Sequence, residues 1–132
     1  INSLLRLSRF LINKYKINPQ NILGHSDIAP DRKKDPGEKF PWKDLAKNNL
    51  TIWHNLNEKK LKQNRLKKLN EIEDKIFLEN LYTIGYDKIK KLNADFNKKF
   101  LYKAFQRRFR PCLVNGKSDY ECYLISKNLL KS

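Results

Sequence analysis

The sequence predicts an α+β protein with one short strand and several amphipathic helices. Apolar residues recur at helical spacing from Asn2 to Tyr15, and the short apolar run 21–24 that follows is typical of a buried strand. Helical spacing returns in the second half of the chain, in three segments: 66–84, 93–110 and 118–132. We therefore expect part of a sheet-containing domain, followed by a small three-helix domain.

The first segment predicts a helix with a broad buried face. Its apolar positions share one side of the helix: Leu4, Leu5, Leu7, Leu11, Ile12 and Tyr15. Downstream, residues 26–42 contain three prolines and a glycine, which predicts a stiff loop.

A polar stretch from 48 to 63 marks the expected domain boundary. Ile52, Trp53 and Leu56 are its main apolar residues and would anchor a linker to a neighbouring surface. We predict domains at 1–50 and 66–132, joined by a linker at 51–65. Within the second domain, Gly85 and Pro111 would end the first two helices, and Ser118 with Glu121 has the spacing of a capping box for the third.

The chain is strongly basic. It has 29 Lys and Arg residues against 14 Asp and Glu residues, a formal charge of +15, which attracts polyanions such as nucleic acid or wall polymers. Twenty-two of these cations are lysines, accompanied by 15 asparagines, and this favours a compositional bias over a dedicated binding surface. Aromatic and basic residues alternate between Phe96 and Arg110, but Phe100, Phe105 and Phe109 follow near-helical spacing, so a buried helix stripe is favoured over a base-stacking platform.

The two cysteines, Cys112 and Cys122, have no spacing typical of a zinc knuckle or redox pair. Unpaired, mostly buried thiols are expected, although an oxidising compartment would permit a disulfide. No apolar run approaches the roughly 20 residues of a membrane-spanning helix.

Candidate chemistry is concentrated around His25. This imidazole follows the expected strand, and Asp35 lies ten residues later on the proline-rich loop. Both side chains are zinc ligands by type. Pro36 disfavours helix at Asp35, and in extended chain Lys33 and Asp35 point to the same side.

The run from Gly24 to Trp42 resembles the zinc-binding segment of the type 2 family of N-acetylmuramoyl-L-alanine amidases. Gly-His-Ser-Asp-Ile-Ala-Pro, Arg-Lys, Asp-Pro-Gly and Phe-Pro-Trp occur in the family's order and spacing. The resemblance implies a mixed-sheet catalytic domain and zinc-dependent hydrolysis of the amide between N-acetylmuramic acid and L-alanine in peptidoglycan or muropeptides.

The resemblance also implies a role for individual residues. His25 and Asp35 match metal ligands, and Lys33 matches a cation that stabilises the oxyanion. Ala29 and Arg32 would border the stem peptide of the substrate, whose carboxylates suit a guanidinium, although Arg32 is equally compatible with a solvated surface residue. Asp27 is either a partner that orients a ligand or a loop-capping residue.

The family's first histidine ligand and its catalytic glutamate have no counterpart in this sequence. His54 lies in the linker and is not expected to bind metal. The chain starts at Ile1 and contains no methionine, so we expect a C-terminal piece that is inactive alone and requires an upstream segment of the same enzyme.

The second domain resembles a peptidoglycan-binding-like domain through Ile-Gly-Tyr-Asp at 84–87 and Ala-Phe-Gln-Arg-Arg-Phe-Arg-Pro at 104–111. Wall binding and a purely scaffolding role both remain open for it. Amidases with such a domain resemble envelope enzymes, which favours a periplasmic or envelope location in a bacterium over the cytoplasm. The alternatives to an amidase are a basic helical nucleic-acid-binding module and a noncatalytic wall-anchoring fragment, and we expect no nucleic-acid partner.

Overall fold

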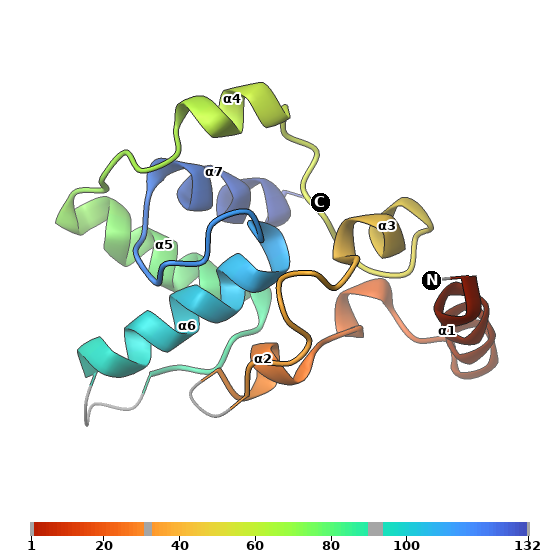
Figure 1. Cartoon of the computed structure of the whole chain (residues 1–132). Coiled ribbons are helices and arrows are strands. Elements are labelled where there is room, and N and C mark those ends of the chain that lie inside the picture. The colour runs from red at the N-terminus through yellow and green to blue at the C-terminus, as the bar shows by residue number, and fades with distance from the viewer. Residues whose placement is uncertain (1, 31–32, 90–93, 132) are drawn as a thin grey trace.

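A computed structural model describes residues 2–30, 33–89 and 94–131 and contains only helices in these ranges (Figure 1). The longer helices are α1 (Asn2–Tyr15), α5 (Glu71–Ile84), α6 (Ala94–Phe109) and α7 (Tyr120–Leu129). The shorter ones are η1 (Pro19–Asn21), α2 (His25–Ile28), α3 (Trp42–Lys47) and α4 (Glu58–Gln63). No helix of the described residues is long and apolar enough to cross a membrane.

The predicted α+β class, with a mixed sheet, is wrong for the described chain. Residues 22–24 are extended, as the backbone angles of Ile22 and Gly24 show, but they pair with no strand in the described ranges. An extended segment becomes part of a sheet only when a neighbouring strand supplies its hydrogen bonds. The apolar run therefore predicted the extended conformation correctly. The described residues are all-helical because no second strand pairs with this segment.

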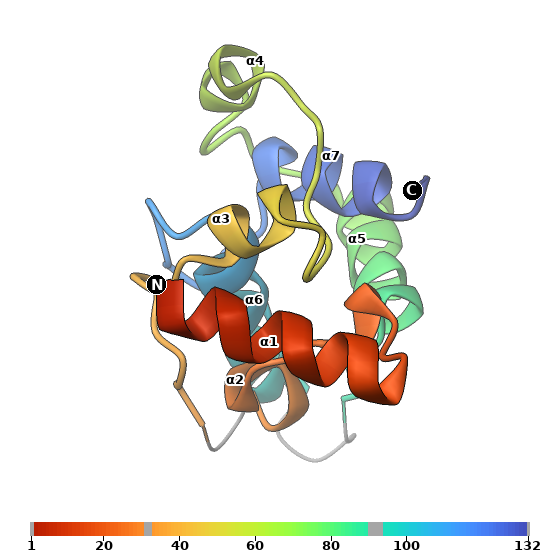
Figure 2. The ribbon, with the colours of Figure 1, turned by 90° about the vertical axis from the view of Figure 1, so that its right-hand side faces the viewer.

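The N-terminal part has a small apolar core. Trp42, Leu45 and Leu50 are buried there, and half-buried residues from α1 and the following turn pack against them: Leu4, Leu5, Ile12 and Ile22. Figure 2 shows α1 running beneath α3. The predicted extent of α1 is confirmed, but its broad buried face is not, because Leu7 and Tyr15 are 56% and 61% exposed.

The larger core lies between α5, α6 and α7. Phe77, Leu81, Phe105 and Ile125 are at most 1% exposed, and the rings of Phe77 and Phe105 meet edge to face with centroids 5.4 Å apart. Each fully buried side chain of this size contributes about 1.5–3 kcal/mol to folding. The helical stripe predicted for α6 is confirmed at Phe105 and Phe109, whose burial leaves these rings no face for a stacked base.

Two helix starts differ from the prediction. The first helix of the C-terminal part begins at Glu71 rather than near 66, because the Asn70 side chain accepts from the Glu73 amide and the Glu73 carboxylate accepts from the Asn70 amide. At α7 the cap is Asp119, which accepts from the Cys122 amide. The predicted capping residue, Ser118, instead donates its hydroxyl to Asp74.

Both cysteines are free thiols, as expected. Cys122 is buried in the larger core, and burial raises the pKa of its thiol. Cys112 is exposed, contrary to the expectation that both would be mostly buried.

Candidate metal site at the His25 turn

The segment predicted as an irregular loop contains a single helical turn, α2, that begins at His25. Gly24 precedes it in extended conformation, and the Asp27 carboxylate accepts from the Gly24 amide at 3.1 Å. Ser26 and Asp27 are buried, whereas His25 is exposed. The turn therefore anchors its polar middle in the protein and presents the imidazole to solvent.

The structure brings His25 and Asp35 together. His25 Nδ1 and Asp35 Oδ2 are hydrogen-bonded at 2.6 Å, and the two side chains are 69% and 66% exposed. The Ser26 amide donates to the Asp35 carbonyl at 2.8 Å, so a backbone bond also joins the turn to the loop. The α2 turn and Asp35 are therefore joined by a side-chain and a backbone hydrogen bond, with two zinc-ligand types at the surface.

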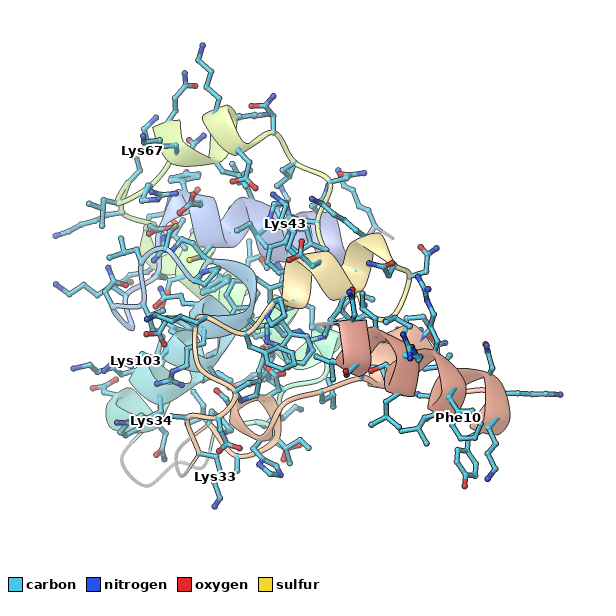
Figure 3. All side chains as sticks on the ribbon, turned by 45° about the vertical axis from the view of Figure 1, so that its right-hand side comes forward. Phe10, Lys33, Lys34, Lys43, Lys67 and Lys103 are labelled. Carbon is cyan, nitrogen blue, oxygen red and sulfur yellow. The ribbon has the colours of Figure 1, made fainter. Side chains whose placement is uncertain are left out.

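The charge environment of Asp35 favours its ionised form. The hydrogen bond from His25 lowers the pKa of the Asp35 carboxyl, and the positive charge of Lys33 lowers it further. The Lys33 amide donates to the Ala29 carbonyl at 2.8 Å, and the Lys33 side chain extends from the loop into solvent in Figure 3. A carboxylate that keeps its charge is the form that binds a metal ion.

The structure describes one of the two residues predicted to bind substrate. Ala29 is buried, with 8% exposure, and its amide donates to the His25 carbonyl. Arg32 lies outside the described residues. The assignments of Ala29 and Arg32 to substrate binding remain predictions.

His54 lies away from this pair in the linker, buried against the neighbouring Trp53 ring with centroids 5.2 Å apart. Its Nδ1 accepts from the Leu56 amide, and burial lowers the pKa of the imidazole. His54 thus acts as a packing residue of the linker.

The two residues fit zinc in donor chemistry, with one imidazole nitrogen and one carboxylate oxygen already facing each other. No group of three or more His, Cys, Asp or Glu side chains within residues 2–30, 33–89 and 94–131 could hold a metal ion. Zinc sites use at least three protein ligands, so this pair alone would not make a complete zinc site.

Close packing at Gly24 gives a direct test of the turn. A Cβ added there would lie 2.3 Å from Pro36 Cδ. We expect Gly24→Ala to destabilise the chain by about 1–3 kcal/mol, because Pro36 and the loop that carries Asp35 must shift. Gly37→Ala is the matched control, since a Cβ at Gly37 meets nothing within 4 Å. Thermal unfolding of both variants measures this difference, and equal midpoints would contradict the tight contact.

A buried group of polar residues lies behind the turn, and the sequence alone did not predict it. Tyr86 and Arg108 both donate to the Asp27 carboxylate, at 2.6 and 2.9 Å. These contacts join residues 59 and 81 positions apart, so no local spacing announces them. The only available signal was that both residues fall in the segments that resemble the family's C-terminal domain.

Almost the whole chain is similar to known amidases. N-acetylmuramoyl-L-alanine amidase AmiD of Escherichia coli is 34% identical over 131 residues, which is 99% of this chain and 47% of that protein. The solved complex of that amidase with anhydro-N-acetylmuramic acid-L-Ala-D-γ-Glu-L-Lys superposes with a TM-score of 0.82, covering 98% of this chain and 50% of the other. The chain is homologous to the N-acetylmuramoyl-L-alanine amidases.

Further amidases agree with this relationship. AmpDh3 from Pseudomonas aeruginosa, solved with anhydromuramic pentapeptide, has a TM-score of 0.80 at 29% identity and covers 98% of this chain. The 1,6-anhydro-N-acetylmuramyl-L-alanine amidase AmpD of Enterobacter cloacae is 51% identical over 39 residues, or 30% of this chain. No family model matches the chain. The chain spans about half the length of the amidase AmiD, which it matches along almost all of its own residues.

Proposed function

We propose that the chain is the part of a zinc-dependent N-acetylmuramoyl-L-alanine amidase that supplies two metal ligands, His25 and Asp35. The reaction is hydrolysis of the amide between N-acetylmuramic acid and L-alanine in a peptidoglycan fragment. The observation that carries the proposal is the 2.6 Å contact between these two side chains, in a chain that superposes on a substrate-bound amidase. An imidazole and a carboxylate at one exposed point supply the donor types of a hydrolytic zinc site.

The chain's residues have separate tasks in this proposal. His25 and Asp35 bind the metal, and Lys33 places a positive charge beside them, where negative charge develops on the carbonyl oxygen of the scissile amide. Zinc, when bound, polarises that carbonyl and lowers the pKa of water. Ala29 and Arg32 would contact the stem peptide, where the Arg32 guanidinium matches its carboxylates.

The proposal requires further polypeptide, because His25 and Asp35 leave the site short of one ligand and of a general base. Exposed apolar side chains on α1 and beside His25 suit such a partner. Leu7, Phe10 and Tyr15 on α1 are 56–61% exposed, and Leu23 and Ile28 on either side of His25 are 49% and 58% exposed. Figure 3 shows Phe10 pointing away from the rest of the molecule. We infer that these exposed apolar side chains contact the half of an amidase that the chain does not match.

A two-domain layout is also part of the proposal, with residues 1–50 belonging to the catalytic domain and 66–132 to a peptidoglycan-binding-like domain. The apolar clusters around Trp42 and Phe105 have different buried residues, which supports this division, and Trp53 packs against both of them. The resemblance to two-domain amidases favours a periplasmic or envelope location.

The decisive experiment uses a joined polypeptide, in which the unmatched half of the E. coli amidase AmiD is placed before this chain. Anhydro-N-acetylmuramic acid-L-Ala-D-γ-Glu-L-Lys is the substrate, and mass spectrometry identifies the products. We expect the free sugar and the intact tripeptide, which are released only if the sugar-to-alanine amide breaks. A folded joined polypeptide that binds zinc and leaves this substrate whole would overturn the proposal.

A further inference from the structure

The carboxylate of Asp27 joins the His25 turn to the C-terminal helices. It is 8% exposed and accepts three hydrogen bonds, one from the Gly24 amide within the turn and two from distant side chains. The Tyr86 hydroxyl, just after α5, donates at 2.6 Å, and Arg108 Nη1, near the end of α6, donates at 2.9 Å. A buried carboxylate with three donors is fixed in place, because losing one leaves an oxygen lone pair unsatisfied.

Arg108 extends this connection to the rest of the N-terminal part. Its Nη2 donates to the Ile22 carbonyl at 3.0 Å and to the Thr51 hydroxyl at 2.8 Å. Its guanidinium lies over the Trp42 ring, 4.3 Å from the centroid, and the side chain is 4% exposed. One arginine of α6 therefore binds segments before and after the site as well as the turn itself.

Arg107 makes a second contact to the same turn. Its Nη1 donates to the Ser26 hydroxyl at 3.2 Å, and Ser26 is 3% exposed. The Ser26 amide is bonded to the Asp35 carbonyl, so the chain of contacts from α6 reaches both candidate ligands through backbone. His25 and Asp35 are themselves mostly exposed, and their orientation depends on the backbone that carries them.

We propose that Tyr86 and Arg108 are positioning residues that hold the His25 turn through Asp27, so that the C-terminal helical unit is a structural part of the metal site. The proposal rests on the zinc amidase function proposed above. It assigns the C-terminal unit a role in metal binding that is independent of whether this unit binds the cell wall. Replacing a residue that holds a metal ligand in its orientation typically weakens metal affinity by about 10–100-fold.

The first test compares Tyr86→Phe with Tyr102→Phe in the 132-residue chain. Each variant removes one hydrogen bond from a buried tyrosine of the helical unit to an aspartate, at 2.6 Å to Asp27 and at 2.9 Å to Asp74. The readout is hydrogen exchange of the Ser26, Ala29 and Lys33 amides, which are bonded within the turn and loop. We expect Tyr86→Phe to speed their exchange about 10-fold and Tyr102→Phe to leave it within about 2-fold of the wild type.

This readout uses neither metal nor substrate, so it separates the two proposals. Faster exchange only in Tyr86→Phe supports positioning even if the joined polypeptide leaves muropeptide whole, an outcome that overturns the function alone. Equal exchange in both variants, whether unchanged or uniformly faster, would overturn the positioning role.

Zinc affinity of the joined polypeptide is the second readout, measured by competition with a chelating dye. We expect Tyr86→Phe to weaken zinc binding by about 10-fold or more and Tyr102→Phe to change it less than about 2-fold. Unchanged affinity in a folded Tyr86→Phe protein contradicts the proposal.

If Tyr86→Phe fails to fold, Arg108→Lys and Arg110→Lys form a second matched pair. Both arginines are buried, but Arg110 bonds Asp119, Glu121 and the Leu113 carbonyl inside the C-terminal unit. Lysine keeps the charge and loses the forked geometry. We expect only Arg108→Lys to weaken zinc binding and to speed hydrogen exchange of the turn amides. The same effects in Arg110→Lys would refute the positioning role of Arg108.

Discussion

Replacing Asp35 with alanine in the joined polypeptide is expected to weaken zinc binding by more than about 100-fold and to remove hydrolysis of the muropeptide. Residues behind a metal ligand already change affinity by about 10–100-fold, so loss of the ligand itself must cost more. The carboxylate also holds His25 at 2.6 Å, and its removal leaves the imidazole without that restraint. Metal analysis after dialysis and a chelator titration measure the effect.

Glu38→Ala is the control for this change. Glu38 is an exposed acid on the same loop, so its replacement removes the same charge from the same segment. We expect it to retain zinc and activity. If Asp35→Ala retains stoichiometric zinc with the affinity of the Glu38→Ala protein, Asp35 is not a ligand.

Lys33→Ala is expected to lower kcat by about 100- to 1,000-fold while zinc remains bound. A single group that stabilises an oxyanion contributes this much in other hydrolases. Lys33 lies in the same loop as Asp35, and its charge acts on the Asp35 carboxyl. Steady-state kinetics on the anhydromuropeptide, with metal content measured in the same samples, separate a slower chemical step from metal loss.

Lys34→Ala provides the comparison, because it removes the same charge from the adjacent exposed position. In extended chain neighbouring side chains point to opposite sides, so Lys34 should not reach the site. Its kcat is expected to stay within about 3-fold of the wild type. An unchanged kcat in Lys33→Ala would remove this lysine from the mechanism.

Features of the fold that depend on residues close together in the chain could be predicted from the sequence. Helical spacing predicted α1 and α6 closely, and the buried stripe of α6 followed from it. The strand at 21–24 was wrong because pairing is a property of two segments, and spacing describes one. The start of α7 was misplaced by one residue, since Asp119 and Ser118 are both good caps and only the contact of Ser118 with Asp74 decides between them.

In the candidate site, too, local features could be predicted and contacts between distant segments could not. His25 and Asp35 were found because their types and surroundings resemble a known family, and the loop between them is short enough to bring them together. Tyr86 and Arg108 could not be found, because their contacts with Asp27 join segments that lie 59 and 81 positions apart in the chain. The amphipathic pattern of α1 predicted that Leu7 and Tyr15 are buried. Both side chains are exposed, because the described residues do not cover them.

The position of zinc in crystals of the joined polypeptide tests the central claim most directly. Anomalous scattering at the zinc edge locates the ion independently of any assumption about its ligands. We predict one ion within about 2.0–2.2 Å of a ring nitrogen of His25 and a carboxylate oxygen of Asp35, in place of their present hydrogen bond. A zinc ion bound elsewhere, with His25 and Asp35 still hydrogen-bonded to each other, would contradict the account.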